Sequence, residues 1–478
     1  MKKAYEILEK ILDERDRALW LMLTDNSKES IHLYCVLVEK KIPVMLVEKS
    51  TSQKKIQQII HEFQPAYLLM PKEGWDLFPF LKLEQGKGYG HYEVWKNNES
   101  KVWKNQNIEP QVAVLLSTSG TTGSGKFVIL TYENLESNTD SIIESLNMTE
   151  KDRVAVMLPI SYSYGLSVVN STLKAGGTLL FSKGMMMQKS FWEYLEEEKV
   201  TMLSGVPYTY EVIKRMRILE RPLRDLRILT QAGGAMSLSM KQYLLEEVER
   251  RKRKGQEVEL AIMYGQTEAT ARMSSFFLNR YPHKINSVGQ AISGGKFTIK
   301  APDSEGKGEI LYQGRNISWG YAWSWRDLTE EVLGVKKRNG CLYTGDIGSL
   351  DEEGFLYVTG RKSRFVKVRG YRISLDELQK ELSQELKSQV VCVNGLDENT
   401  DKIGVGIVDK GLLEESTRES TGKERCREGK QLLTELEQIL SRKRIQRQEY
   451  HMRIMEALPR RSNGKIDYRE LQKKIFGK

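Results

Sequence analysis

Glycines, hydroxyl side chains and one lysine are concentrated between Ser117 and Lys126, directly after the apolar stretch Val112–Leu116. Glycines let the backbone approach a phosphate closely, while hydroxyls and an ammonium group supply hydrogen-bond donors. The candidate phosphate-binding residues are Thr118, Ser119, Gly120, Thr121, Thr122, Gly123 and Lys126. A Walker phosphate loop has the same glycine and Gly-Lys spacing but needs Ser or Thr next, to hold magnesium. The next residue is Phe127, so the Walker interpretation fails.

Two more polar segments each follow a short apolar stretch. Gln231-Ala232-Gly233-Gly234-Ala235 comes after Leu226–Leu229, and Tyr264-Gly265-Gln266-Thr267-Glu268 comes directly after Met263. Glu268 is a candidate magnesium ligand, because magnesium is a hard cation that prefers oxygen. A surface turn after a strand would explain one glycine but not the whole pentapeptide.

The last third of the chain carries three further motifs. They are Tyr343-Thr344-Gly345-Asp346, Gly360-Arg361, and Leu458–Ile466 with its Gly464-Lys465 pair. Taken singly, Asp346 is typical of a turn and Lys465 of a solvated surface. Their functional interpretation therefore depends on their order along the chain.

In this order, the motifs resemble those of the adenylate-forming superfamily, which includes acyl-CoA synthetases, peptide-synthetase adenylation domains and luciferases. The resemblance extends over nearly the whole chain. The phosphate-gripping loop of that superfamily typically reads Ser-Gly-Thr-Thr-Gly-x-Pro-Lys-Gly, and here Gly125 stands in place of the proline. The resemblance implies an ATP- and magnesium-dependent enzyme that joins a carboxylic acid to a thiol.

The resemblance also implies a role for each motif residue. Tyr264 would stack on adenine, beside Gly233, Gly234, Ala235, Gly265 and Gln266. Thr267 would bind the α-phosphate, Glu268 would hold magnesium, and Asp346 and Arg361 would bind the ribose. Lys465 would bridge the acid's carboxylate and the α-phosphate, so the implied catalytic residues are Lys465, Thr267, Glu268 and Lys126. Such groups place positive charge where negative charge builds up during the reaction.

The same resemblance implies a mobile C-terminal part. Lys362 and Ser363 would form its hinge, although the family commonly has Asp or Lys at the position of Ser363. Gly370 and Tyr371 would line the tunnel through which the thiol enters.

The segment Pro159–Leu166 occupies the position of the family's acid pocket, and Tyr162 and Gly165 are the candidate pocket residues. Amino-acid-activating members carry Asp about where Gly165 falls, and a buried ammonium without that partner is costly. A fatty or aryl acid is therefore expected rather than an α-amino acid. Tyr162 stands where many acyl-CoA synthetases have His, and core packing explains Tyr162 and Tyr164 equally well.

Composition describes an ordinary globular chain. Of 478 residues, 40% are hydrophobic and 29% charged, with a formal net charge of +10. This charge suits an anionic partner, which could be nucleic acid, an acidic membrane surface, or nucleotide and coenzyme phosphates. The basic runs at 250–254 and 442–444 lie in helix-like stretches and are interpreted as solvated faces. Four cysteines lack metal-ligand or disulfide-framework spacing, which indicates a reducing compartment. With no long apolar segment, the sequence predicts a cytoplasmic protein without a membrane span.

The elements that position these motifs alternate between short apolar strands and helices. Strands are expected at 18–23, 44–47, 112–116, 178–181, 226–229 and 260–263, with a helix at 30–39. This alternation predicts an α/β fold, with a large N-terminal domain of mostly parallel sheets flanked by helices. After Gly354 we expect a hairpin of 355–358 with 365–368, helices at 375–386 and 424–445, and a strand at 390–393. The predicted domains are 1–360, which binds ATP and the acid, and a small mobile α+β lid at 361–478.

The expected function is an AMP-forming ligase that activates a small carboxylic acid and transfers it to coenzyme A. A first alternative is an acyl-AMP ligase that loads the phosphopantetheine arm of an acyl carrier protein, because that arm ends in the same thiol. A second, of another class, is a non-catalytic nucleotide- or nucleic-acid-binding protein. The ligase interpretation expects no nucleic-acid partner. It assigns Lys465 a role, whereas the non-catalytic alternative assigns that residue none.

Overall fold

The computed structural model describes residue 6 and residues 17–72, 83–97, 107–117, 126–182, 184–335, 340–362, 364–368, 371–395, 402–408, 432, 434–443, 445–461 and 464–477. The chain forms two compact units. Unit 1 comprises Met1–Phe297 and Tyr312–Leu342, and unit 2 comprises Thr298–Leu311 and Tyr343–Lys478.

Unit 1 contains an eight-stranded sheet in the order β17-β7-β6-β2-β1-β3-β5-β4. Its central strands β6, β2, β1 and β3 are parallel, while β7 and β5 pair antiparallel at either side. The bounds are β1 Trp20–Thr24, β2 Val44–Glu48, β3 Tyr67–Pro71, β4 Leu83–Tyr89, β5 Tyr92–Asn97, β6 Val112–Ser117, β7 Phe127–Thr131 and β17 Tyr321–Ala322. β1 and β7 are buried along their whole length, as expected for strands covered on both faces.

A second sheet of unit 1 has seven strands in the order β14-β13-β12-β11-β10-β8-β9. Strands β12, β11, β10, β8 and β9 are parallel, and β13 and β14 continue the sheet antiparallel. The bounds are β8 Arg153–Ala155, β9 Thr178–Leu180, β10 Met202–Gly205, β11 Ile228–Gln231, β12 Glu259–Tyr264, β13 Ser274–Phe277 and β14 Gln290–Ala291.

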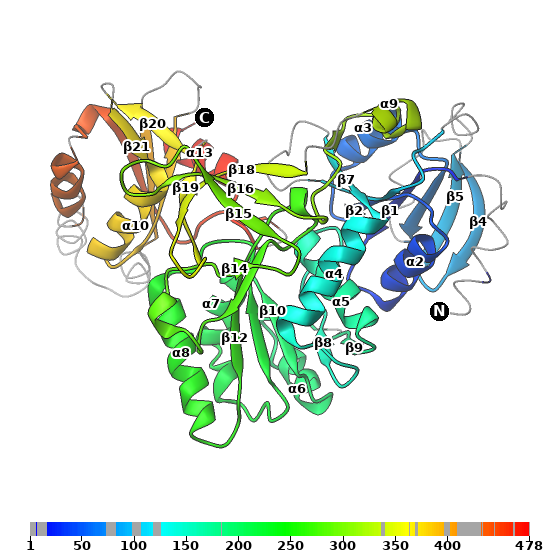
Figure 1. The fold of residues 1–478 in the computed structure, drawn as a ribbon, viewed down its shortest axis with the longest axis horizontal. Coiled ribbons are helices and arrows are strands. Elements are labelled where there is room, and N and C mark those ends of the chain that lie inside the picture. The colour runs from blue at the N-terminus through cyan, green and yellow to red at the C-terminus, as the bar shows by residue number, and fades with distance from the viewer. Residues whose placement is uncertain are drawn as a thin grey trace, which may run out of the picture. The chain divides into compact units, whose positions relative to one another are not determined.

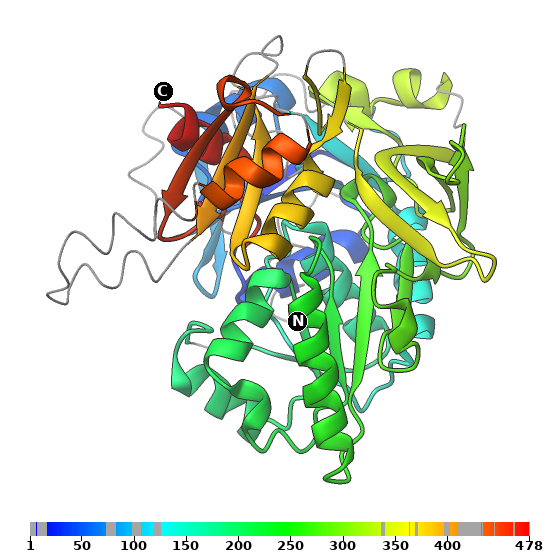
Figure 2. The ribbon, with the colours of Figure 1, turned by 90° about the vertical axis from the view of Figure 1, so that its left-hand side faces the viewer.

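Helices form layers on both sheets (Figures 1 and 2). Apolar side chains of α3 pack on one face of the first sheet, and those of α2, α4 and α5 pack on the other. α4 and α5 also pack against the second sheet, so they form a layer that both sheets share. α7 and α8 contact β10 and β12, and Figure 1 shows them on the opposite face of the second sheet from α4 and α5. The bounds are α2 Lys28–Glu39, α3 Gln53–Phe63, α4 Tyr132–Leu146, α5 Ser163–Lys174, α6 Lys189–Glu197, α7 Pro207–Arg215, α8 Leu238–Lys252 and α9 Glu330–Val335.

A buried carboxylate joins the amino ends of the second sheet's parallel strands. Asp152, directly before β8, accepts hydrogen bonds from Arg227 Nε (2.7 Å) and Nη2 (2.6 Å) before β11. It also accepts one from Thr201 Oγ1 (2.9 Å) before β10, and its carbonyl accepts one from Thr178 N (2.7 Å) in β9. Burial by itself raises the pKa of Asp152, but these hydrogen bonds outweigh it and lower the pKa below its ordinary value.

The described residues of unit 2 form three small sheets. β15, β16, β18 and β19 form the first in that order, β20 pairs with β21, and β22, β23 and β24 form the third. Helices α10 and α13 pack on the third sheet through separate apolar clusters. The bounds are β15 Lys296–Lys300, β16 Gly308–Gln313, β18 Cys341–Leu350, β19 Leu356–Arg361, β20 Phe365–Val368, β21 Tyr371–Ser374, β22 Gln389–Asn394, β23 Ile403–Val408, β24 Tyr450–Met455, α10 Leu375–Glu385 and α13 Tyr468–Phe476.

The predicted α/β fold with large, mostly parallel sheets is confirmed, and the predicted strands correspond to β1, β2, β6, β9, β11 and β12. The predicted hairpin of 355–358 with 365–368 is wrong. β19 pairs with β18, while β20 pairs with β21, because each strand has a closer partner across its own turn. Residues 343–360 pack within unit 2. The predicted domain boundary near Gly360 concerns where the chain can hinge, and it stays a prediction.

The basic run at 250–254 is not wholly a solvated face. Arg251 is 4% exposed, and its guanidinium hydrogen-bonds to the carbonyls of Leu219, Arg221 and Leu223 and to Gln256 Oε1. Within the described residues, no helix is long and apolar enough to cross a membrane.

We expect Asp152→Asn to lower the free energy of unfolding of unit 1 by about 2–4 kcal/mol at pH 7, because it leaves Arg227 without its buried partner. The charged carboxylate stabilises the fold above its unfolded pKa of about 4, and this contribution is lost as the pH falls through the lowered native pKa. The difference between wild type and variant should therefore shrink below about pH 4. Thermal unfolding at a series of pH values measures it. Glu133→Gln, which removes the exposed ion pair with Arg315, is the control and should cost less than about 1 kcal/mol.

Candidate active site

The Tyr264–Glu268 motif begins at the last residue of β12 and continues into a tight loop. A Cβ at Gly265 would lie 1.8 Å from the carbonyl oxygen of Ala271, so only glycine fits where the loop folds back. Tyr264 is half-buried, with its ring 6.4 Å from that of Phe297. The motif therefore lies at the carboxyl end of a parallel strand, where open α/β sheets usually bind ligands.

Glu268 and Lys126 are brought together by a tyrosine that the sequence did not single out. The Tyr321 hydroxyl donates a hydrogen bond to Glu268 Oε1 at 2.8 Å. Lys126 Nζ lies 3.8 Å from the centre of the same tyrosine ring, which is cation–π geometry. Burial, followed by the charge of Glu268, raises the pKa of Tyr321, so the hydroxyl stays protonated as the donor.

This arrangement follows from strand pairing and from a second segment held against the motif loop. Tyr321 in β17 pairs with Val128 in β7, which places it beside Lys126. Ser318 N donates to the Glu268 carbonyl (2.8 Å), and Asn316 Nδ2 donates to the Ala269 carbonyl (2.9 Å). Tyr321 thus reaches Glu268 only because residues 316–318 are hydrogen-bonded to the loop after β12.

The amino end of α5 forms another side of this region. Ser163 Oγ lies 3.3 Å from Thr267 Oγ1, and the α5 N-cap residue, Tyr162, makes no side-chain capping bond. The free amino end of a helix carries partial positive charge and favours an anion. A Cβ at Gly233, whose φ is +81°, would lie 2.3 Å from the Tyr162 hydroxyl, so glycine is required for Tyr162 to lie over this loop.

Glycine at position 165 is explained by close packing against the backbone and not by contact with a substrate. A Cβ there would lie 2.2 Å from the Pro159 carbonyl oxygen and 2.8 Å from that of Leu158. A side chain at position 165 would therefore meet backbone and not a substrate amine. The absence of Asp at Gly165 gives no support to the exclusion of α-amino acids. Tyr164 is a core residue, with its hydroxyl bonded to the carbonyl of Thr230 at 3.0 Å.

Two buried donors near the motif have no hydrogen-bond partner among the described residues. They are Gln266 Nε2, inside the motif, and Arg272 Nη1, just after it. Buried polar groups are normally paired, so unpaired donors here fit a region that receives polar ligand atoms. Glu268 supplies one carboxylate for a cation. Magnesium completes its coordination with waters and phosphates, so a single carboxylate fits it.

The remaining candidates lie in unit 2. Arg361 Nε donates to Asp346 Oδ1 at 3.0 Å, across the paired strands β18 and β19. Lys362 Nζ is bonded to Glu309 Oε2 at 2.9 Å. Lys465 belongs to a separate turn, in which Arg460 pairs with Ile466 and Arg461 N donates to the Lys465 carbonyl at 2.8 Å. Within unit 2, the two ribose candidates therefore contact each other across β18 and β19. Lys465 belongs to a different segment of the chain, outside that strand pair.

Comparison with known proteins identifies the family. The AMP-binding enzyme family matches residues 22–322, which is more than half of the chain. The chain belongs to this family. An indoleacetate–CoA ligase of Aromatoleum aromaticum is 29% identical over 67% of this chain and 62% of its own length. A 2-succinylbenzoate–CoA ligase of Listeria monocytogenes is 28% identical over 76% of this chain and 70% of its own length.

Solved structures share the fold of this AMP-binding enzyme. An O-succinylbenzoate coenzyme A synthetase from Bacillus subtilis, in complex with AMP, superposes with a TM-score of 0.69 at 20% identity, covering 98% of this chain and 91% of that one. ATP-bound MatB from Rhodopseudomonas palustris gives a TM-score of 0.70 at 20% identity, covering 99% and 92%.

Several predicted site residues of this AMP-binding enzyme lie outside the described residues. They are Thr118, Ser119, Gly120, Thr121, Thr122, Gly123, Ser363 and Gly370. For Tyr371 only the backbone is described, as the first residue of β21. Gly234 and Ala235 are exposed on the loop after β11. Tyr321, Ser163 and Arg272 were missed, because no local motif marks them and their placement depends on contacts distant in sequence.

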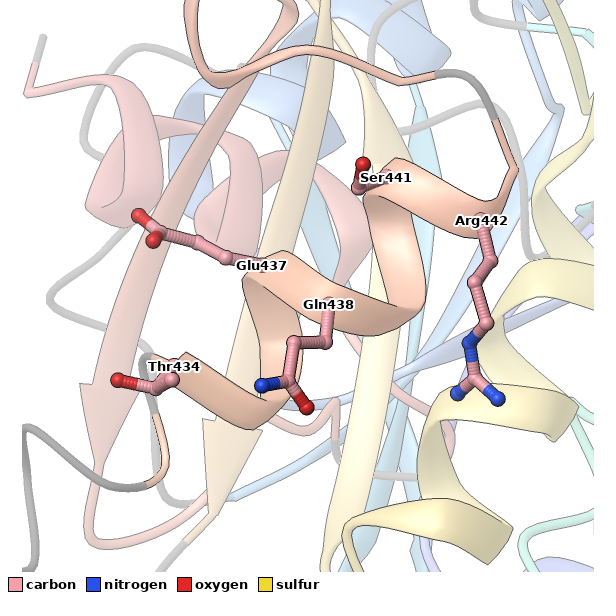
Figure 3. Close-up of a pocket in the computed structure, with 5 residues that line it drawn as sticks. All are labelled: Thr434, Glu437, Gln438, Ser441 and Arg442. Carbon is pink, nitrogen blue, oxygen red and sulfur yellow. The ribbon is translucent and has the colours of Figure 1, made fainter.

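A hollow on the helix at 434–442 does not compete with this site. It is lined by Thr434, Glu437, Gln438, Ser441 and Arg442, all from one helix (Figure 3). Figure 3 shows these side chains spreading apart rather than converging on one point. Arg442 is already paired with Glu385. Ligand sites are concave and built from convergent groups, which this surface lacks.

We expect Gly165→Ala to lower the unfolding free energy of this AMP-binding enzyme by about 1–3 kcal/mol, because the added methyl group collides with backbone that cannot easily move. Gly234→Ala is the matched control. Its Cβ would make only ordinary contacts with Pro207 at 3.4 and 3.5 Å, so stability should change little. Urea unfolding of both variants measures the difference. Equal stability of the two would show that position 165 has room for a side chain.

Proposed function

We propose that this chain is an ATP-dependent acid:thiol ligase that first forms an acyl-adenylate and then an acyl-thioester of coenzyme A. The observation that carries this proposal is the grouping of Lys126, Tyr321 and Glu268 beside the loop that holds Thr267. Family membership supports AMP chemistry. The relatives named for indoleacetate–CoA and 2-succinylbenzoate–CoA ligation support an acid substrate and coenzyme A.

In the first half-reaction, a carboxylate oxygen attacks the α-phosphorus of ATP, and the bond to the β-phosphate oxygen breaks to release pyrophosphate. Two anions must approach each other, so the barrier depends on positive charge fixed beforehand. Thr267 and Ser163 supply hydroxyl donors next to the amino end of α5, and Lys126 over the Tyr321 ring supplies an ammonium group. Magnesium neutralises phosphate charge when bound. Glu268 is positioned to hold it by the hydrogen bond from Tyr321.

In the second half-reaction, the thiol sulfur attacks the acyl carbon, AMP leaves, and the thiol proton passes to solvent. We propose that Asp346 and Arg361 bind the ribose and that Lys465 serves only the first step. Lys362 and Ser363 would form the hinge, and the Gly370–Tyr371 segment would serve the second step. One C-terminal lid acting in turn on two reactions is a known kind of gating motion.

The proposed acid is an aryl or fatty acid bound near Tyr162. The half-buried Tyr162 ring lies beside Tyr164 and over Gly233, so it borders both the acid segment and the loop assigned to adenine. We propose coenzyme A as the acceptor, with an acyl carrier protein as the alternative. Work in the cytoplasm is proposed because Cys35, Cys341 and Cys392 are free thiols.

A pyrophosphate-release screen over fatty, aryl and amino acids tests the function. We expect release with at least one acid and ATP, and thioester formation only when a thiol is added. Coenzyme A and a carrier protein bearing phosphopantetheine are supplied separately to identify the acceptor. Tight ATP binding without pyrophosphate release under any condition would instead favour the non-catalytic nucleotide-binding interpretation.

We expect Lys465→Ala to slow acyl-adenylate formation by about 10²–10³-fold, the usual cost of losing one preorganised charge contact. The same variant, given preformed acyl-adenylate, should make thioester at a nearly normal rate. Lys473→Ala, on the exposed face of α13, is the control and should leave both rates unchanged. A Lys465→Ala variant that slows both steps equally would contradict the proposed division of labour.

A further inference from the structure

In the described part of unit 1, two arginines are each only 4% exposed, yet the terminal nitrogens of their guanidinium groups differ in their partners. Arg251 makes four hydrogen bonds: Nη1 to Leu223 O (3.3 Å) and Gln256 Oε1 (2.6 Å), and Nη2 to Leu219 O (2.7 Å) and Arg221 O (3.0 Å). Nη1 of Arg272 is enclosed and has no hydrogen-bond partner among the residues that the structure describes, whereas in Arg251 only Nε is left in that state.

The backbone of Arg272 is held firmly against the active-site motif. Asn138 Nδ2 and Asn316 Nδ2 donate to its carbonyl at 2.8 and 2.9 Å, and Asn138 Oδ1 accepts from its N–H at 3.3 Å. Its Cα lies 2.9 Å from where a Cβ on Gly265 would be. The side chain therefore starts from a rigid position directly behind the Tyr264–Glu268 motif.

The guanidinium of Arg272 is buried near Tyr164. Burial lowers the pKa of Arg272 to about 10, and the nearby Tyr164, whose own pKa burial raises to about 12, is neutral at pH 7 and supplies no counterion. Tyr164 points inward to Thr230 of β11, while the preceding Ser163 faces Thr267. A buried cation without a counterion is costly, and groups perturbed in this way are concentrated at functional sites.

We propose that Arg272 binds a second carboxylate of the acid substrate, remote from the carboxylate that reacts, so that the enzyme activates dicarboxylic acids. This inference rests on the proposed ligase function and narrows its substrate class. The planar guanidinium suits a carboxylate because it can donate two parallel hydrogen bonds. Gln266 Nε2, the other unpaired donor, offers a further contact to the same substrate.

The reacting carboxylate is a poorer candidate for this partner. It must reach the α-phosphorus beside Thr267, whereas Arg272 is grouped with Tyr164. Pairing with a guanidinium also lowers the basicity of a carboxylate, and would therefore weaken it as a nucleophile.

The test compares acids that differ only in the second carboxylate. One pair is 3-phenylpropanoate with 3-(2-carboxyphenyl)propanoate, and another is hexanoate with hexanedioate. Pyrophosphate release gives kcat/KM for each. We expect the wild type to favour the diacid of at least one pair by about 10²-fold or more, since an unpaired buried charge is left when the monoacid binds. Arg272→Met should lower that diacid-to-monoacid ratio by about 10²–10³-fold.

Arg251→Met is the matched control, because Arg251 is equally buried but both of its terminal nitrogens already donate hydrogen bonds within the protein. It should lower the melting temperature and leave the diacid-to-monoacid ratio unchanged. The diacids alone, without ATP, should raise the melting temperature of the wild type but not of Arg272→Met. Should Arg272→Met fail to fold, Arg272→Lys, which keeps the charge without the planar fork, should lower the ratio by about tenfold.

The outcomes separate the two proposals. If monoacids are turned over as well as their diacid partners, or if the ratio survives in the Arg272 variants, the role of Arg272 is wrong while the ligase stands. If no acid in a panel that includes both classes releases pyrophosphate, the ligase function fails and this inference fails with it.

Discussion

The buried carboxylate of Asp152 is the contact on which the second sheet of unit 1 depends. It joins residues directly before β8, β10 and β11, while its own carbonyl receives the backbone of β9. Parallel strands that are aligned at one end are also aligned at the other, so fixing the amino ends fixes where the carboxyl ends emerge. The loops after β10, β11 and β12 therefore leave one edge of the sheet together. The candidate site is built from the loops at that edge.

Within the site, Tyr321 is the side chain that brings other residues together, as Asp152 does in the second sheet. A lysine and a glutamate of opposite charge approach the same side chain, one at the ring face and the other at the hydroxyl. Neither charge neutralises the other directly, so both remain able to meet a nucleotide and its metal ion. The arrangement depends on residues 316–318, whose hydrogen bonds to the loop after β12 bring β17 into position.

Several polar side chains in the interior of the second sheet are paired with one another, whereas two of the ten unpaired buried polar atoms of the described residues lie at the motif loop. Tyr164 and Tyr210 both donate to the carbonyl of Thr230, and Thr230 Oγ1 donates to Ser204. Against this background the unpaired nitrogens of Gln266 and Arg272 stand close together in sequence, on either side of the Glu268 loop. Proteins tend to break local rules of this kind where function requires it.

The sequence by itself determined the fold class, most strands of the parallel sheets and the places of the main motifs. These follow from apolar stretches and helical periodicity, which are local properties of the chain. Tyr264–Glu268 could be placed at a strand end because β12 is continuous with it.

Only the tertiary structure decided that Tyr321 meets Glu268, that Gly165 packs against Pro159, and that β19 and β20 do not pair. It also decided that Nη1 and Nη2 of Arg251 are hydrogen-bonded whereas Nη1 of Arg272 is not. Each of these depends on strand register or on contacts between segments far apart in sequence. Such contacts are selected by packing and by hydrogen-bond pairing in the whole fold, and no short stretch of residues encodes them.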